Sequence, residues 1–299
     1  MKKLLLAGTY SPIPTPFNAK GVVAYDKLAE NIARWSKTSL AGLLVLGSNG
    51  EFTYLSDEEK LEVLKTARQA IPKDKLFIAG TGCDSTRATL ELTEQAAAIG
   101  ADVAMLITPG YYPSKMDGHA MQRHYLELAE HSPLPILLYN MPANTGVDLS
   151  AETVVELSQH PNIAGIKDSS GNVVKLGEII RAASPDFNVL AGSASFLYPA
   201  LVLGAVGGIM ALANIAPEQC YRIYQYTQNE QHKEARQLQL KMIPVNISVT
   251  ARFGVPGLKL ALDWLGYYGG PPRSPLGPLD KAQQAALRAT LIEGGILKA

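Results

Sequence analysis

The chain has little cysteine and no excess of charge of either sign. Its 299 residues include two cysteines, Cys83 and Cys220, which are too few and too far apart for a disulfide framework. A reducing compartment suits such a chain, so we expect a cytoplasmic protein. The 27 Lys and Arg residues balance the 27 Asp and Glu residues. This balance argues against nucleic acid or an anionic membrane surface as the partner.

The chain also lacks the motifs of common metal and dinucleotide sites. Its five histidines show no zinc-ligand spacing, and no Gly-x-Gly-x-x-Gly stands at the first strand–helix turn. The most apolar stretch, residues 200–216, carries no charge but is interrupted by Gly204, Gly207, Gly208 and Asn214. A membrane span needs about 20 apolar residues. We therefore expect a buried helix followed by a buried strand, and no membrane partner.

Short apolar runs alternate with amphipathic stretches along the chain. Alternation of this kind predicts parallel strands joined by helical crossovers. The expected strands are residues 9–13, 42–46, 76–79, 103–107, 136–139, 163–167, 189–191 and 208–211. Eight such units match an α/β fold of the (β/α)8 TIM-barrel type. We expect the barrel to occupy residues 1–216, and residues 217–299 to form helices that pack on it without being an independent domain.

Helix boundaries are signalled at several places. Ser56 and Glu59 have the spacing of a capping box, and Ser150 is a second N-cap candidate. Gly100 and Gly204 stand where helices are expected to end.

A single lysine, Lys167, ends the apolar run of residues 163–166. In a (β/α)8 barrel the active site lies at the C-terminal ends of the strands, where Lys167 would stand. Burial disfavours a charged amine and lowers its pKa, and a neutral lysine attacks carbonyls to form a Schiff base. The alternative is an ordinary strand-end lysine whose amine reaches solvent.

Other polar residues follow neighbouring strands. The turn from Gly47 to Gly50 offers backbone N–H groups and the side chains of Ser48 and Asn49 to one carboxylate or phosphate, although a plain turn fits as well. Tyr139 ends an apolar strand and could relay protons beside Lys167, or be a core tyrosine. The adjacent pair at positions 111 and 112 is typical of packing or of an interface.

Together these motifs resemble those of the dihydrodipicolinate synthase/N-acetylneuraminate lyase family of class I aldolases, along essentially the whole chain. The matching stretches are Gly47-Ser48-Asn49-Gly50-Glu51, Tyr111-Tyr112, Tyr139-Asn140-Met141-Pro142, Gly165-Ile166-Lys167-Asp168 and Pro256-Gly257-Leu258-Lys259. The resemblance implies a barrel with a C-terminal helical extension and a homotetramer built as a dimer of dimers.

The resemblance also implies roles for individual residues. Lys167 matches the Schiff-base lysine, Tyr139 the proton-relaying tyrosine, and Tyr112 the tyrosine that a neighbouring subunit inserts into the site. Ser48 and Asn49 match the pair that binds the pyruvate carboxylate and joins the hydroxyl relay. Gly192 and Ser193 match residues that line the pocket. Ile209 matches the pocket residue whose carbonyl faces the lysine amine.

Departures from the synthase pattern point to a particular substrate. Dihydrodipicolinate synthases carry Thr-Thr in place of Ser48-Asn49, and an arginine at the place of Asn144, which cannot supply a charged fork. The stretch Pro142-Ala143-Asn144-Thr145-Gly146 and the longer stretches 252–259 and 263–271 look instead like those of 4-hydroxy-2-oxoglutarate aldolases, which give pyruvate and glyoxylate. We expect Asn144 to line the substrate site, and Ser169 and Asn49 to help hold the second carboxylate.

No metal or organic cofactor is expected, because the iminium replaces a Lewis acid. The alternatives are dihydrodipicolinate synthesis, another pyruvate-dependent aldol reaction, or a barrel that binds a 2-oxo acid without turnover.

Overall fold

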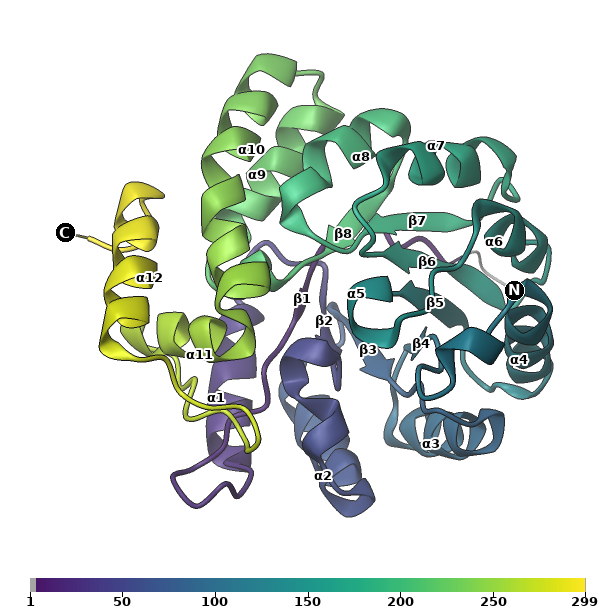
Figure 1. The fold of residues 1–299 in the computed structure, drawn as a ribbon, viewed down its shortest axis with the longest axis horizontal. Coiled ribbons are helices and arrows are strands. Elements are labelled where there is room, and N and C mark those ends of the chain that lie inside the picture. Colours follow the sequence, from purple (N-terminus) through teal and green to yellow (C-terminus); the bar gives the residue numbers. More distant parts are fainter. Residues whose placement is uncertain (1–3, 299) are drawn as a thin grey trace.

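Eight parallel strands close into a barrel in the computed structural model, which describes residues 4–298 (Figure 1). The strands pair in chain order, and β8 closes the sheet against β1. They are β1 (Gly8–Pro12), β2 (Gly42–Val45), β3 (Leu76–Gly80), β4 (Val103–Ile107), β5 (Ile136–Asn140), β6 (Ile163–Asp168), β7 (Asn188–Ala191) and β8 (Gly207–Ile209). The predicted (β/α)8 TIM barrel is confirmed, and every strand bound lies within two residues of the prediction.

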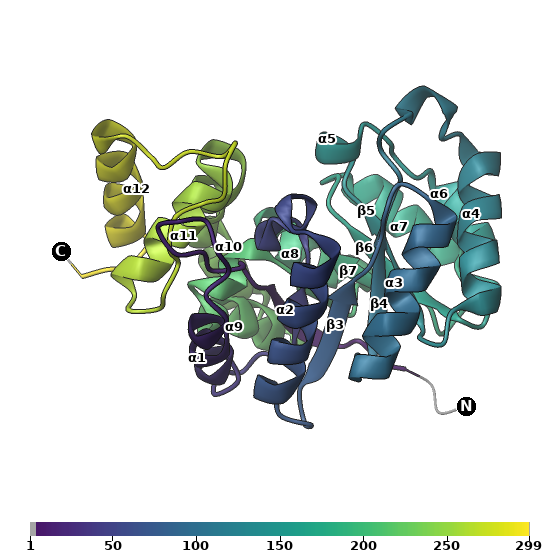
Figure 2. The same cartoon turned by 90° about the horizontal axis from the view of Figure 1, so that it is seen from below.

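Helices surround the barrel and extend beyond it on one side (Figure 2). They are α1 (Tyr25–Trp35), α2 (Asp57–Ala70), α3 (Thr86–Ile99), α4 (Gly118–His131), α5 (Pro142–Thr145), α6 (Ala151–Leu157), α7 (Val173–Ala182), α8 (Leu197–Leu203), α9 (Pro217–Gln228), α10 (His232–Ile247), α11 (Gly254–Trp264) and α12 (Lys281–Glu293). The capping signals are confirmed: Ser56 and Glu59 form a capping box at α2, and Ser150 caps α6. Gly100 and Gly204 end α3 and α8 in the left-handed conformation that glycine adopts without strain.

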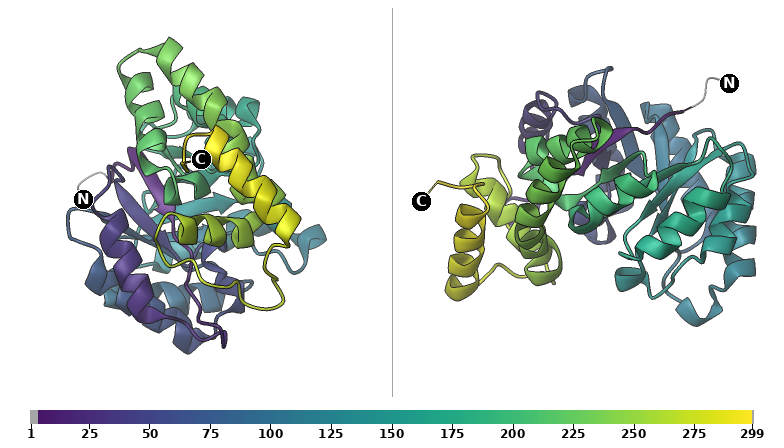
Figure 3. Two further views of the ribbon diagram at one scale, coloured as in Figure 1. Left: turned by 90° about the vertical axis from the view of Figure 1, so that its left-hand side faces the viewer. Right: turned by 90° about the horizontal axis from the view of Figure 1, so that it is seen from above.

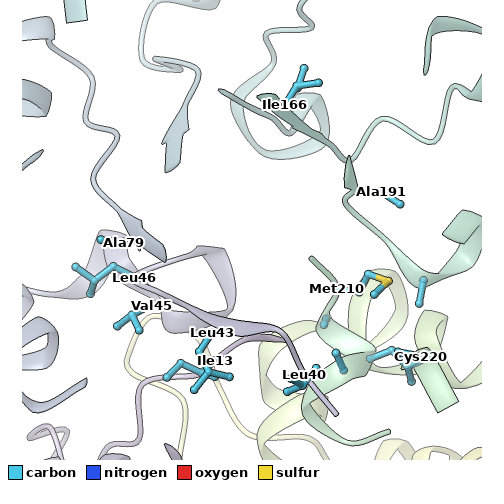
Figure 4. Close-up of a cluster of buried hydrophobic side chains, with 14 of the residues drawn as sticks. Ile13, Leu40, Leu43, Val45, Leu46, Ala79, Ile166, Ala191, Met210 and Cys220 are labelled. Carbon is cyan, nitrogen blue, oxygen red and sulfur yellow. The ribbon is translucent and has the colours of Figure 1, made fainter. Parts of the chain in front are cut away.

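Strand side chains alternate between two apolar layers. Leu43, Val45 and Ile166 belong to the large cluster between the strands and the surrounding helices (Figure 4). Leu44 and Leu137 belong to a second cluster inside the barrel. Because successive strand residues point to opposite faces, this parity decides which residues near each strand end face the barrel axis.

The C-terminal helices form a stack beside the barrel (Figure 3). α9 contacts β1 and α8, in the position of the eighth barrel helix. α10 packs on α9, a π-helical segment at Ser248–Arg252 leads into α11, and α12 contacts α10 and α11. The division into a barrel of residues 1–216 and helices of residues 217–299 stays a prediction. Residues 1–3 and 299 of these ranges lie outside the described residues.

The uncharged stretch of residues 200–216 contains the end of α8 and all of β8. The predicted buried strand is confirmed, whereas the helix is buried on one face only, because Val202 and Leu203 are exposed on its outer side. Within residues 4–298, no helix combines the length and the apolar character that a membrane span requires. Cys83 and Cys220 are both free.

Candidate active site

Lys167 and Tyr139 lie directly opposite each other on neighbouring strands. The β5–β6 register pairs Tyr139 with Lys167, and the β6–β7 register pairs Lys167 with Leu190. Tyr139 and Leu190 belong to the cluster inside the barrel, and Lys167 and Tyr139 are only 4% and 3% exposed. The strand-end lysine is thus enclosed near the barrel mouth, and its amine does not reach out into solvent.

The surroundings of Lys167 favour the neutral amine. Burial lowers the pKa of Lys167 from its usual 10.5, and the nearby Tyr139 opposes part of that effect. The Lys167 Nζ atom lies 3.9 Å from the centre of the Tyr139 ring. A buried amine with a lowered pKa next to a phenol can attack a carbonyl and exchange protons with its neighbour.

The turn after β2 brings Ser48 to Tyr139. A short 3-10 helix, Ser48–Gly50, follows β2 directly, and Ser48 Oγ lies 3.4 Å from the Tyr139 hydroxyl. The Asn49 side chain donates from Nδ2 to the carbonyl of Pro12 at 3.3 Å, which ties the turn to the end of β1. The structure therefore brings Lys167, Tyr139 and Ser48 together, with Asn49 beside them.

A cavity of about 750 Å³ opens next to Ser48. This volume lies within the range of small-molecule sites, about 300–1,000 Å³. Its wall includes Asn144 on α5 and Tyr111 from the loop after β4. The C-terminal part of the chain contributes as well, because Phe253–Pro256 and Leu276 line the same cavity.

The ends of β7 and β8 carry the residues predicted to line the pocket. Gly192 N donates to the Asp168 carbonyl at 2.7 Å, and a Cβ at Gly192 would stand 2.0 Å from Ser169 Oγ. Ser193 Oγ accepts a hydrogen bond from Asn246 Nδ2 at 2.9 Å. Ile209 is fully buried in the cluster inside the barrel. Glycine at position 192 is thus required because the Asp168 backbone leaves no room for a Cβ, and the binding roles stay predictions.

Tyr112 lies on the surface of the chain. It is 66% exposed, and its ring meets that of Tyr111 edge to face at 4.9 Å. Asp84 holds this loop, because its carboxylate accepts hydrogen bonds from the N–H groups of Gly110 and Tyr111. The role predicted for Tyr112 requires a second subunit and stays a prediction.

A buried polar network that the sequence analysis did not assign lies one residue beyond the Tyr139–Lys167 pair. Asp168 is fully buried, and its carboxylate accepts from Asn140 Nδ2 at 2.7 Å and Ser170 N at 2.9 Å. Its Oδ2 atom also lies 3.1 Å from the Lys175 ammonium, which contacts Asp148 at 2.5 Å. This network fixes the ends of β5 and β6 relative to each other.

A sequence signal for this network exists. Asn140 directly follows Tyr139, and Asp168 directly follows Lys167. The β5–β6 register therefore pairs Asn140 with Asp168. A carboxylate at the end of a buried strand needs such partners, because an unpaired buried charge is costly. In the part of the chain that the structure describes, no group of three or more His, Cys, Asp or Glu side chains is placed to hold a metal ion.

Comparisons with known proteins show which family the chain is similar to. A sequence model described as the dihydrodipicolinate synthetase family matches residues 5–293. An uncharacterized DapA-like lyase of Halobacterium salinarum is 36% identical over 292 residues, covering 98% of this chain and 95% of that protein. A protein of Emericella nidulans named probable mitochondrial 4-hydroxy-2-oxoglutarate aldolase is 34% identical over 294 residues, covering 97% and 95%.

Synthases are similar to the chain at the same level. A 4-hydroxy-tetrahydrodipicolinate synthase of Thermoanaerobacter sp. is 32% identical over 292 residues, covering 97% of each chain. The crystal structure of a dihydrodipicolinate synthase from Acinetobacter baumannii complexed with pyruvate superposes with a TM-score of 0.93 at 33% identity, covering 98% of this chain and 100% of that one. The chain therefore belongs to the dihydrodipicolinate synthetase family, whose members are class I aldolases and lyases that form a Schiff base with pyruvate.

Proposed function

We propose that the protein cleaves 4-hydroxy-2-oxoglutarate to pyruvate and glyoxylate through an imine on Lys167. One observation carries the proposal: the buried Lys167 amine lies against the Tyr139 ring, and the Tyr139 hydroxyl lies within 3.4 Å of Ser48 Oγ. A nucleophile with a lowered pKa and a two-hydroxyl relay are the groups that a Schiff-base aldolase needs.

The proposed reaction begins when the neutral Lys167 amine adds to the C2 carbonyl. Tyr139 donates its hydroxyl proton to the departing oxygen, so that water leaves and an iminium forms beside the Tyr139 phenolate. Tyr139, linked to Ser48, removes the proton of the C4 hydroxyl. The C3–C4 bond then breaks, its electron pair enters the iminium to give an enamine, and glyoxylate departs. Protonation of the enamine at C3 and addition of water release pyruvate and restore the amine.

The choice of substrate rests on the residues around the cavity. Asn144, where synthases carry an arginine, lines the cavity with a neutral amide. Ser48 lines the cavity, and Asn49 follows it in the same turn. We propose that Ser48 and Asn49 bind the first carboxylate while Ser169 and Asn49 help to hold the second. Gly192, Ser193 and the Ile209 carbonyl complete the proposed pocket. The similarity to the Emericella nidulans protein supports this choice.

Dihydrodipicolinate synthesis is the second candidate, because relatives named as synthases are about as similar to the chain as the one named as an aldolase. The two reactions share pyruvate and differ in the aldehyde. Asn144 favours the first candidate, since an asparagine cannot pair with a carboxylate as arginine does.

Borohydride reduction in the presence of pyruvate tests the chemistry. Mass spectrometry of peptides should find the reduced adduct on Lys167 and none on Lys175, a buried lysine held in ion pairs. An unmodified Lys167 would exclude the imine mechanism and leave the non-catalytic binding barrel.

Parallel condensation assays of pyruvate with glyoxylate and with aspartate semialdehyde test the substrate. We expect product with glyoxylate. Product with aspartate semialdehyde alone would assign the chain to the synthases.

We further propose that the enzyme works without metal or organic cofactor, since the iminium supplies the electron withdrawal. We propose one structural domain that assembles as a homotetramer, a dimer of dimers, in which Tyr112 reaches a neighbouring site. The exposed Tyr111–Tyr112 pair supports such an interface, because exposed aromatic residues are enriched where subunits meet. Sedimentation velocity measures the assembly directly. A cytoplasmic location stays a prediction from the low cysteine content.

A further inference from the structure

The turn that carries Ser48 and Asn49 is bounded by two strained residues. Leu46, before the turn, has φ of 60°, and Glu51, after it, has φ of 53°. Residues other than glycine adopt this left-handed conformation at a cost, and they keep it only where the surroundings enforce it. Something outside the turn must therefore hold it in place.

Glu51 is held by residues from the far end of the chain. Its Oε1 atom lies 2.5 Å from the ammonium of Lys259 on α11, and both side chains are 1% exposed. Its Oε2 atom accepts a hydrogen bond from Arg273 N at 2.8 Å. A buried ion pair is often no more stabilising than apolar side chains of similar size. Stability alone therefore does not explain why the pair is there.

The contacts around the ion pair continue on both sides of the turn. Lys259 Nζ donates to the Pro271 carbonyl at 3.1 Å, and the Arg273 guanidinium donates to the Tyr54 carbonyl at 2.7 Å. On the barrel side, Thr15 Oγ1 donates to the Gly50 carbonyl at 2.7 Å. The segment from Gly50 to Tyr54 is thus fixed between the segment that follows β1 and the C-terminal part of the chain.

The charge of Lys259 matters for a ligand at this turn. The Glu51 carboxylate follows Ser48-Asn49-Gly50 in the chain, and alone it would repel a second carboxylate bound by the turn. Lys259 neutralises it at short range inside the protein, where screening by water and salt is weak. The turn can then present its N–H groups and hydroxyl to an anion without a like charge behind them.

We propose that the Glu51–Lys259 ion pair is a positioning element for the pyruvate carboxylate, so that the C-terminal helices take part in substrate binding. The proposal deepens the proposed function and rests on it. Neither residue is assigned contact with substrate. They act through Ser48 and Asn49 by fixing the turn and by removing its charge.

A double variant, Glu51→Gln with Lys259→Met, tests the proposal because it removes both charges without leaving either one alone. The readout is the amount of pyruvate trapped on Lys167 by borohydride as the pyruvate concentration is varied. We expect the half-saturating concentration to rise about tenfold or more, because the turn that binds the carboxylate is no longer held by the ion pair. Full labelling should still be reached at saturation, because Lys167 and Tyr139 are unchanged.

Asn188→Ala is the matched control. Asn188, at the start of β7, accepts from Leu6 N and donates to the carbonyls of Leu4 and Ala164, so this variant loses buried polar contacts at the opposite end of the barrel. We expect a lower melting temperature with the half-saturating pyruvate concentration of the wild type. Wild-type saturation in a folded double variant would overturn the proposal.

A double variant that fails to fold is replaced by Glu51→Asp, which keeps the charge and shortens the side chain by one methylene. Weaker pyruvate saturation in this variant supports the positioning role, and unchanged saturation overturns it. A wild-type protein that traps no pyruvate would instead refute the proposed function itself, which separates the two failures.

Discussion

Replacing Asp168 by asparagine should destabilise the protein far more than the same change at Asp148. Both carboxylates contact the Lys175 ammonium, at 3.1 Å and 2.5 Å, and both accept from Asn140 Nδ2 at 2.7 Å. They differ in exposure, because the Asp168 side chain is 0% exposed and that of Asp148 is 53% exposed. The two variants therefore compare one interaction type in two environments.

The expected magnitudes follow from this difference. Removing one partner of a buried ion pair costs about 3–5 kcal/mol, and Asp148 remains to compensate Lys175 in part, so about 3 kcal/mol is expected for Asp168→Asn. The exposed Asp148 pairs in a solvated position, where ion pairs contribute about 0–1 kcal/mol, so Asp148→Asn should cost less than about 1 kcal/mol.

Urea unfolding followed by circular dichroism measures both free energies. Unfolding of the two variants and the wild type should show the same dependence on urea concentration, since the surface exposed is unchanged. Equal losses in the two variants, or a loss below about 1 kcal/mol for Asp168→Asn, would refute the view that burial makes Asp168 the anchor of the β5–β6 ends.

Three further outcomes are expected. Tyr139→Phe should still form the borohydride-trapped imine on Lys167 but turn over about 10²–10⁴ times more slowly in single-turnover assays; turnover like that of the wild type would exclude the proton relay. The rate of imine formation with pyruvate should rise with pH through the lowered pKa of Lys167 and level off below the usual 10.5, since burial favours the neutral nucleophile; a rise that continues to 10.5 would contradict the burial effect. Gly192→Ala should lower the free energy of unfolding by about 1–3 kcal/mol in thermal melts, because the new Cβ would stand 2.6 Å from the Asp168 carbonyl oxygen, a backbone atom that cannot rotate away as the Ser169 hydroxyl can. Gly277→Ala is its control, since a Cβ there meets no atom within 4 Å.

Much of the fold and part of the candidate site follow from local sequence patterns. The apolar runs ending at Tyr139 and Lys167 predict adjacent barrel strands, and the structure places the two side chains opposite each other. Ser56 and Ser150 predict helix starts because capping depends on a few neighbouring residues. These signals involve residues close together in the sequence, whose spacing determines the local backbone structure.

The partners of Glu51 could not be predicted in this way. Lys259 and Arg273 reach it from α11 and the loop beyond, and no local spacing relates these positions to the turn after β2. Asn246 on α10, which donates to Ser193 Oγ, was missed for the same reason. How α10 and α11 pack on the barrel is set by burial over many residues rather than by one motif.

The composition of the cavity wall has a consequence for how new specificities arise in this protein. Phe253–Pro256 and Leu276 line the cavity but belong to the C-terminal part of the chain, while the amine and the phenol stand on barrel strands. Substitutions at these wall positions can change the size and polarity of the space for the departing aldehyde without touching β5 or β6. Directed evolution toward bulkier acceptors can therefore vary Phe253, Val255 and Leu276, which stand apart from the residues proposed to make and break bonds.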